Sequence, residues 1–272
     1  MTHTIKNKVS DRRHDRLTKL AALALAAFVL PACGAGSSGH GELGKHQQVL
    51  AACDPGTPPA SLIAFDGTGS STSDAIAAER MIAVEDVVRR TAVCSGYLRV
   101  LVFSASSAAT KVLFDGSLKQ DGATDNARLK KVPDAVAQTV NELRTGYSSA
   151  IQALPQGGSD ITAQYRLAAE WQQQLGDRYR LDLMMFTDGL QNVGVDLGAT
   201  VLTKEQATAL ADQVMVPKLP GASVVVAGLG RVAEGAPPSA LVEGLVAYYD
   251  RLCQRTEAAA CTSVSDYAPQ GR

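Results

Sequence analysis

The sequence predicts an α/β fold with a doubly wound, mostly parallel sheet, one antiparallel edge strand and helices on both faces. Short, nearly continuous apolar runs are typical of parallel strands covered on both faces, and they lie at 61–65, 98–103, 181–186 and 222–227. Stretches with helical periodicity alternate with these runs, which is the order of a layered α/β domain. The exception is 111–114, because the seven residues between it and 98–103 are too few for a crossover helix.

Three helices are predicted before the strand at 181–186. One is expected to begin near Asp74, after the N-capping side chains of 71–74, and its apolar residues recur at Ala77, Met81, Val84 and Val88. A second opens at Pro133, which suits a first helical turn, and its apolar face is formed by Val136, Val140, Leu143 and Tyr147. A third follows the turn at 155–160, with a stripe formed by Ile161, Tyr165, Ala168 and Leu175.

Two helices and two strands complete the predicted order. Helices are expected at 204–214 and 238–255, on either side of the strand 222–227, and a short final edge strand is expected at 264–267. Right-handed crossovers then bring the carboxyl ends of the parallel strands to one edge of the sheet. Ligands bind at this edge in α/β proteins, so candidate site residues are sought there.

Charge and histidine content exclude several classes of function. The 272 residues carry 26 Lys and Arg against 27 Asp and Glu, and this balance lacks the basic charge of a nucleic-acid-binding domain. All four histidines, His3, His14, His40 and His46, precede residue 47. We therefore expect no imidazole in the folded body, which excludes a Ser-His-Asp triad and a zinc site built on histidine.

The N-terminal segment is predicted to direct export. A basic stretch precedes the apolar run 20–30, which would span roughly 16 Å as a helix, about half of a bilayer core. Residues 1–32 are therefore expected to be a signal peptide and not a lasting membrane span. The run ends in Leu30-Pro-Ala-Cys33, which resembles a bacterial lipobox and implies a lipid on Cys33. Secretion with release is the alternative.

A linker is expected between the anchor and the fold. Residues 33–57 are assigned to it, because 34–44 is rich in Gly and Ser and such composition is typical of a flexible tether. His40 and His46 are interpreted as solvated linker residues. The folded domain is then 58–272.

Four further cysteines are predicted to form disulfides, since an exported chain meets an oxidising compartment. Three pairings are possible for Cys53, Cys94, Cys253 and Cys261. Proximity in sequence favours Cys253 with Cys261, and Cys53 with Cys94. The second pair would tie the entry of the first strand to the end of the first helix.

Oxygen-bearing side chains gather in three predicted loops at the ligand-binding edge. One loop follows the strand 61–65, one precedes the third predicted helix, and one follows the strand 181–186. Two carboxylates and three hydroxyls suit a hard cation such as Mg²⁺, which prefers six oxygen ligands. Glycines between them allow a tight bend. The candidate ligands are Asp66, Thr68, Ser70, Ser159 and Asp188.

These loops, in this order, resemble the metal-ion-dependent adhesion site of the von Willebrand factor type A family. The resemblance extends from the first predicted strand to the last predicted helix. It implies direct contact with the ion for Thr68, Ser70 and Ser159, and contact mainly through water for Asp66 and Asp188. The sixth position would belong to water or to a carboxylate of a partner.

Two neighbouring residues leave alternatives at this site. Thr162 could replace Ser159 as a ligand, although the Gly-hydroxyl-Asp-Ile context favours Ser159. Asp160 could support the site, although its place before a helix favours a capping role.

The resemblance implies an extracytoplasmic protein-binding module, for adhesion or assembly, that depends on Mg²⁺ or Mn²⁺. It would be anchored as a lipoprotein on the outer face of the bacterial membrane, with membrane contact through the lipid alone, and its partner would offer an acidic side chain. We expect no enzymatic activity. The alternatives are a metal-assisted hydrolase that uses Asp66 or Asp188 as a base, and a metal-free structural domain.

Overall fold

The computed structural model describes residues 41–267. The predicted signal peptide (1–32), the predicted lipidation site Cys33 and the histidines His3, His14 and His40 lie outside the described residues. None of the helices between residues 41 and 267 is long and apolar enough to cross a membrane.

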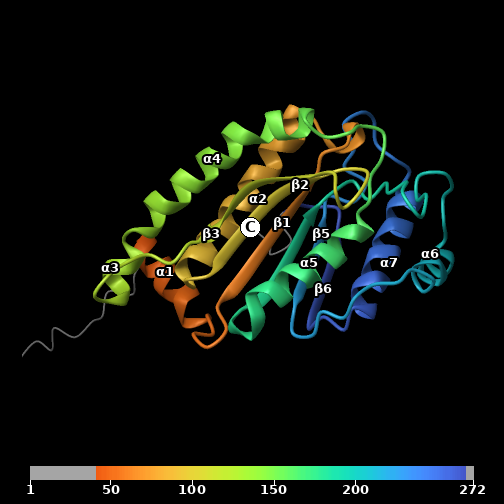
Figure 1. The fold of residues 1–272 in the computed structure, drawn as a ribbon. Coiled ribbons are helices and arrows are strands. Elements are labelled where there is room, and N and C mark those ends of the chain that lie inside the picture. The colour runs from red at the N-terminus through yellow and green to blue at the C-terminus, as the bar shows by residue number, and fades with distance from the viewer. Residues whose placement is uncertain (1–40, 268–272) are drawn as a thin grey trace, which may run out of the picture. The chain divides into compact units, whose positions relative to one another are not determined.

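A six-stranded sheet forms the centre of the fold, in the order β3-β2-β1-β4-β5-β6 (Figure 1). All neighbouring strands are parallel except β2 and β3, which form the antiparallel edge pair. The predicted fold class is therefore confirmed. The strands are β1 (Pro59–Asp66), β2 (Tyr97–Phe103), β3 (Thr110–Ser117), β4 (Arg180–Phe186), β5 (Ser223–Ala227) and β6 (Ala260–Val264).

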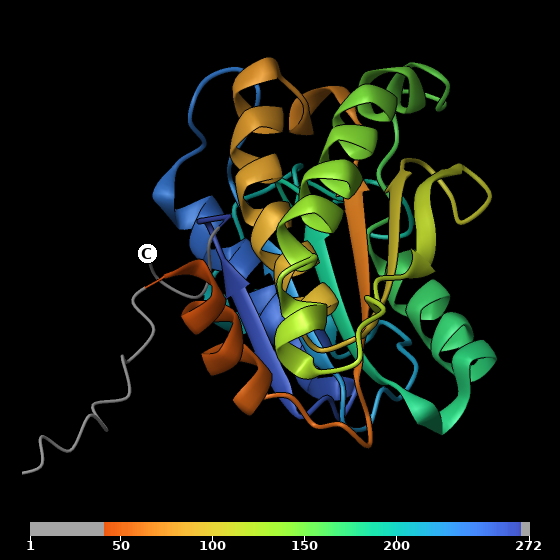
Figure 2. The ribbon, with the colours of Figure 1, turned by 90° about the vertical axis from the view of Figure 1, so that its left-hand side faces the viewer.

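Helices cover both faces of this sheet (Figure 2). Helices α1 to α4 border a core on one face that includes Phe65 and Val84, and α5 to α7 border a core on the other face that includes Leu183. All eight residues of β1 are buried, because this strand is central and covered twice. The helices are α1 (Glu42–Ala51), α2 (Asp74–Val93), α3 (Asp125–Leu129), α4 (Val132–Gln152), α5 (Thr162–Leu175), α6 (Lys204–Ala211) and α7 (Ser239–Arg255).

Ten residues of the expected linker, Glu42–Ala51, form helix α1, and the prediction of solvated His46 was wrong. His46 is 1% exposed, and Leu43 and Val49 of the same helix pack against the core beside α2 and α4. Glycines flank and enter this segment and lower its helix propensity, but burial of an apolar face overrides propensity. The folded body therefore contains an imidazole, although it lies in a helix remote in sequence from the candidate metal ligands.

Three other boundaries differ from the prediction. The last strand is Ala260–Val264, and Tyr267, expected within it, packs in the core at 2% exposure. Helix α6 ends at Ala211 instead of Val214. The five-residue helix α3, capped by the Thr124 hydroxyl, was not expected, because it is too short to show a periodic pattern.

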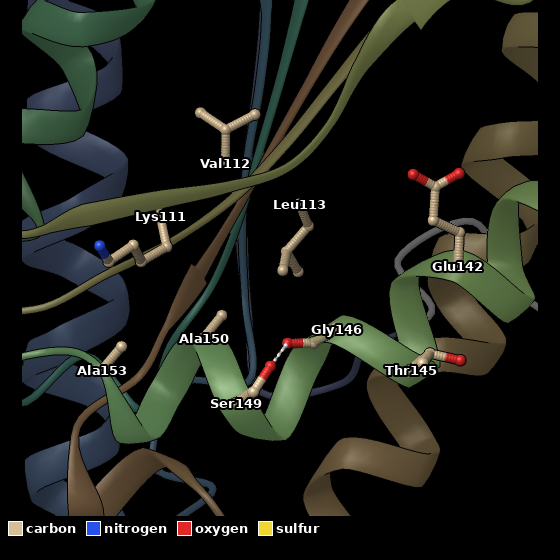
Figure 3. Close-up of a pocket in the computed structure, with 9 residues that line it drawn as sticks. All are labelled: Lys111, Val112, Leu113, Glu142, Thr145, Gly146, Ser149, Ala150 and Ala153. Carbon is tan, nitrogen blue, oxygen red and sulfur yellow. Dashed lines mark hydrogen bonds between the residues drawn. The ribbon is translucent and has the colours of Figure 1, made fainter.

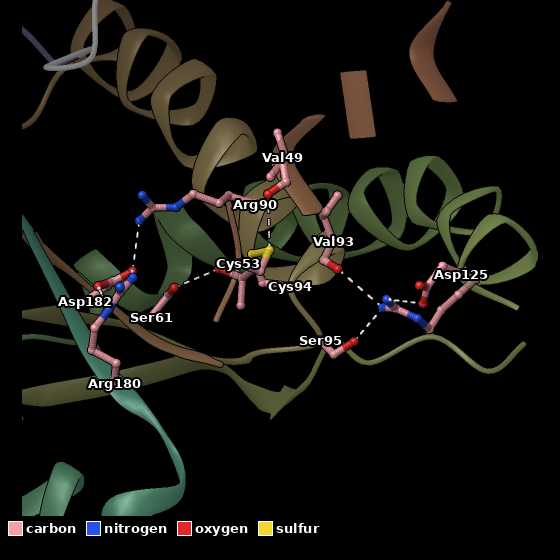
Figure 4. Close-up of a disulfide and its surroundings, with 12 residues drawn as sticks. Val49, Cys53, Ser61, Arg90, Val93, Cys94, Ser95, Asp125, Arg180 and Asp182 are labelled. Atoms are coloured by element: carbon pink, nitrogen blue, oxygen red, sulfur yellow. Dashed lines mark hydrogen bonds and ion pairs between the residues drawn. A yellow bond between two sulfur atoms is a disulfide. The ribbon is translucent and has the colours of Figure 1, made fainter. Parts of the chain in front are cut away.

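Both predicted disulfides are confirmed. Cys53 follows α1 and bonds Cys94, the residue that ends α2 (Figure 4). Cys253 lies in α7 and bonds Cys261 of β6. The first bond lies at the amino ends of the parallel strands, beside the ion pair of Asp182 with Arg90. The candidate metal ligands lie at the opposite, carboxyl ends.

Candidate metal centre

The chain bends sharply where β1 ends, and this bend brings the first candidate ligands together. Asp66 is the last residue of β1, and the Gly67 N–H donates to the Phe103 carbonyl at the end of β2 (2.9 Å). A Cβ at position 67 would come within 2.7 Å of the Val102 side chain, so the close approach requires glycine. A 3₁₀ turn at Gly69–Ser71 follows, and the Ser73 hydroxyl caps α2.

Asp66 is fully buried and accepts four hydrogen bonds. Its Oδ1 accepts from the Thr68 N–H (3.1 Å) and the Thr68 hydroxyl (2.7 Å). Its Oδ2 accepts from the hydroxyls of Ser159 (3.0 Å) and Thr187 (2.7 Å). A hydroxyl that donates its hydrogen in this way keeps its lone pairs for another ligand. The structure therefore brings Asp66, Thr68 and Ser159 together, as expected.

Asp188 is also buried, at 1% exposure, but its carboxylate is only half satisfied. Oδ1 accepts from the Leu190 N–H (2.9 Å), whereas Oδ2 is buried and has no hydrogen-bond partner. Burial, followed by the charge of Asp66, raises the pKa of Asp188 from 3.8 to about 6. The Leu190 N–H, the Ser70 side chain and Arg80 partly oppose this rise.

Ser70 completes the set of five at the solvent side. This residue is exposed, whereas Thr68, Ser159 and Asp188 are buried, and its side chain is near enough to Asp188 to lower the pKa of that carboxyl. Its carbonyl accepts from the Ala233 N–H (2.7 Å), so the loop after β5 holds this position. The cluster is thus buried except at Ser70, where it reaches the surface.

The loop after β4 fixes the position of Ser159. The Asn192 side chain accepts from the Ser159 N–H (2.8 Å) and donates to the Gly157 carbonyl (3.3 Å). The alternative ligand Thr162 donates its hydroxyl to Gln191 (2.8 Å) and not to Asp66. Asp160 accepts from the Ala163 N–H (2.9 Å) in the first turn of α5, as its expected capping role requires.

Two residues of the cluster were missed in the sequence analysis. Thr187 directly precedes Asp188 at the end of β4, and its hydroxyl donates to Asp66. Its position next to a candidate ligand could have indicated that it belongs to the site. Arg80 lies one turn from Ile76 and from Val84 on the buried face of α2. A charged residue inside an apolar stripe was the signal for Arg80, which is fully buried beneath the loop that follows β1.

The donor set fits a divalent cation. It offers two buried carboxylates, one with an unpartnered buried oxygen, and three hydroxyls, which are the neutral and anionic oxygens that Mg²⁺ accepts. Within residues 41–267, no group of three or more His, Cys, Asp or Glu side chains could hold a metal. A metal at this edge would therefore depend on the hydroxyls of Thr68, Ser70 and Ser159.

A groove elsewhere in the described fold carries no comparable chemistry. It has a volume of about 620 Å³ and runs between edge strand β3 and helix α4 (Figure 3). Its charged lining residues are Lys111 and Glu142, and Ser149 donates within its own helix to Gly146 (3.0 Å).

Comparison with known proteins gives limited similarity. No family model matches the chain, and no curated protein matches it. Among solved structures, the open conformation of the pilus adhesin SpaC from Lactobacillus rhamnosus GG is similar at a TM-score of 0.42 and 11% identity, over 79% of this chain and 29% of SpaC. Proximal thread matrix protein 1 from the mussel byssus is similar at a TM-score of 0.34 and 12% identity, over 79% of this chain and 45% of that chain. The chain thus spans less than half of either protein, and similarity at this level carries no argument about function.

Proposed function

We propose that this chain is a divalent-cation-dependent protein-binding module, exported and anchored through a lipid on Cys33. The observation that carries the proposal is the unpartnered, buried Oδ2 of Asp188 beside the buried carboxylate of Asp66. A buried charge without a partner is costly, and two buried carboxylates side by side increase that cost. A dication at this position relieves it.

The residues of the site then have distinct tasks. Thr68, Ser70 and Ser159 offer hydroxyl oxygens to Mg²⁺ or Mn²⁺, and Asp66 and Asp188 balance its charge, mainly through water. When bound, the cation supplies an exchangeable coordination position that an acidic side chain of a partner can fill. Because Ser70 is exposed, the open side of the site faces solvent there.

The export part of the proposal rests on the two disulfides and the lipobox-like segment. Disulfides persist in oxidising compartments, so the bonds Cys53–Cys94 and Cys253–Cys261 support a location outside the cytoplasm. Mass spectrometry of the mature protein from membranes tests the anchor: a diacylglyceryl mass on Cys33 supports it, and an unmodified or differently cleaved N-terminus contradicts it.

Calorimetric titration with Mg²⁺ and Mn²⁺ tests the metal site, with Asp66→Ala as the matched variant. We expect wild type to bind one cation and Asp66→Ala to bind none, because this substitution removes one carboxylate and the acceptor that orients Thr68 and Ser159. Equal cation binding by both proteins would contradict the site. No binding by either protein would leave the metal-free structural domain.

Selection from a displayed peptide library in Mg²⁺ then tests the binding role. The proposal expects peptides whose binding requires an Asp or Glu and is lost in chelator and in Asp66→Ala. Binding that persists in chelator would contradict it. Cation-dependent turnover of ester or phosphoester substrates, lost in Asp66→Ala, would instead establish the hydrolase alternative.

A further inference from the structure

Arg80 is a buried cation that lies between the two carboxylate-bearing loops. It is fully buried in α2, and its Nη1 donates to the backbone carbonyl of Asp66 (3.1 Å). Its Nη2 donates to the Ser71 hydroxyl oxygen (2.6 Å), and the same oxygen accepts from the Asp188 N–H (3.2 Å). One guanidinium therefore contacts the backbone of the first loop and, through Ser71, that of the second.

The groups that hold Arg80 in place are neutral. Nη1 also donates to the Tyr147 hydroxyl (3.2 Å), and the guanidinium lies 5.5 Å from the centre of the Tyr267 ring. None of the ion pairs among residues 41–267 involves Arg80, and its Nε is buried with no hydrogen-bond partner. A buried arginine is normally paired with a carboxylate. Here the negative charges that interact with Arg80 include those of Asp66 and Asp188 at the candidate metal site.

Arg80 interacts electrostatically with both carboxylates of the site. Its charge opposes the rise in the pKa of Asp188 that burial and Asp66 cause. Burial lowers the pKa of Arg80, but Tyr147, Tyr267 and, to a smaller extent, Asp66 more than offset this, so its pKa is raised. With Asp66 and Asp188 both ionised, the three groups carry a net charge of −1, and a bound dication changes this to +1.

We propose that Arg80 is a built-in counter-charge that lowers the cation affinity of the site and gives the loaded site a net positive charge. This inference rests on the proposed function. In the cation-free protein, Arg80 stabilises the two carboxylates in place. In the loaded protein, the surplus positive charge favours an anionic group, such as a carboxylate, at the open coordination position. Arg80 touches neither ion nor partner, so it is a positioning and charge-setting residue.

The test compares Arg80→Gln, which removes the charge, with Arg80→Lys, which keeps it. Arg89→Gln is the matched control, because Arg89 lies on the same helix but pairs with Glu85 at the surface. Mn²⁺ is titrated into each protein by calorimetry at fixed ionic strength and at a pH well above the pKa of Asp188, so that protons do not compete with the cation, and melting temperatures are measured in chelator.

We expect Arg80→Gln to bind Mn²⁺ roughly tenfold more tightly than wild type, because one like charge near the dication is gone. Its cation-free form should melt at a lower temperature than cation-free wild type. Its melting temperature should also rise more on addition of Mn²⁺. Arg80→Lys and Arg89→Gln should keep the wild-type affinity. If Arg80 has a purely structural role, Arg80→Gln should bind Mn²⁺ as tightly as wild type or less tightly. Either result overturns the inference.

Three further outcomes separate the inference from the proposed function. If Arg80→Gln is unfolded without cation, the counter-charge predicts that Mn²⁺ folds it, as seen by circular dichroism, and failure to fold with Mn²⁺ overturns the inference. If wild type itself binds no Mn²⁺, the proposed function fails, and the inference fails with it. If wild type binds Mn²⁺ and Asp66→Ala does not, the metal site holds, and the Arg80 variants then test the inference alone.

Discussion

Strand β4 carries a buried aspartate near each end, and the two are balanced in different ways. Asp182, near the amino end, pairs with Arg90 (2.9 Å) and with Arg180 (3.4 Å), as Figure 4 shows. Asp188 lies two residues beyond the carboxyl end and has the carboxylate of Asp66 nearby. One oxygen of each aspartate, Asp182 Oδ1 and Asp188 Oδ2, accepts no hydrogen bond, but Asp182 Oδ1 lies 3.4 Å from Arg180 Nε. The two side chains are 6% and 1% exposed, so burial alone does not distinguish them.

The difference indicates that the charge of Asp182 stabilises the fold, whereas the charge of Asp188 is available to a ligand. At the amino end of β4, Asp182 is paired with two arginines, and a disulfide joins the end of α1 to the end of α2. At the carboxyl ends, the two buried carboxylates of Asp66 and Asp188 outnumber the one buried cation, Arg80, and such an imbalance of charge is typical of functional sites. We therefore expect changes at the amino ends to alter stability alone, and changes at the carboxyl ends to alter cation binding.

Removing the Cys53–Cys94 disulfide should have the largest effect on stability. Replacing both cysteines by serine frees a loop with a separation of 41 residues and should lower the free energy of unfolding by about 4 kcal/mol. The shorter Cys253–Cys261 loop, with a separation of 8, should cost about 3 kcal/mol. Urea unfolding measures both. The Mn²⁺ affinity of the folded Cys53→Ser/Cys94→Ser protein should stay unchanged, and a tenfold loss would break the comparison.

Asp188→Asn and Asp182→Asn should shift stability in opposite directions. Asparagine mimics the neutral form of Asp188, so Asp188→Asn should stabilise the cation-free protein at neutral pH by up to ~3 kcal/mol while abolishing cation binding. Asp182→Asn loses ion pairs to two partly exposed arginines and should destabilise by about 1 kcal/mol, with cation affinity kept. Thermal unfolding in chelator and calorimetry check both. Destabilisation by Asp188→Asn would contradict the claim that the ionised Asp188 carboxylate costs stability in the cation-free protein.

The stability of the cation-free protein should fall with rising pH because of Asp188. Its folded pKa, about 6, lies above its unfolded value, so its contribution is complete below about pH 4 and is lost as the pH rises through 6. Other groups titrate over the same range, so the quantity to measure is the difference in melting temperature between wild type and Asp188→Asn in chelator. This difference should widen from about pH 4 to about pH 7. Saturating Mg²⁺ should stabilise wild type more at the higher pH, since protons compete with the cation.

Asn192→Ala should give the smallest effect. It removes the side chain that accepts from the Ser159 N–H, so Ser159 loses a fixed position but keeps its hydroxyl. We expect cation affinity to fall by roughly tenfold, with about 1 kcal/mol lost in stability. Gln191→Ala, which frees Thr162, is the control and should change cation affinity less. An equal loss in both variants would mean that the loop acts as a whole.

The strands and the candidate ligands could be predicted from the sequence, because local signals determine them. The run at 61–65 is apolar since β1 is covered on both faces, and Asp66 follows it at the edge where the strands end. The neighbours of that site were harder to predict. Tertiary packing determines which way Thr187 points at the end of β4 and whether Arg80 is solvated or buried. A single sequence does not show this packing. Helix α1 was missed for the same reason, since its stability comes from packing against α2 and from the Cys53–Cys94 bond.

Anomalous diffraction from crystals grown in Mn²⁺ tests the central claim most directly. We predict a single strong anomalous peak at the carboxyl edge of the sheet, in contact with the hydroxyl oxygens of Thr68, Ser70 and Ser159, and no peak there in Asp66→Ala crystals. A wild-type map without density between Asp66 and Asp188, or with manganese bound only elsewhere, would contradict it.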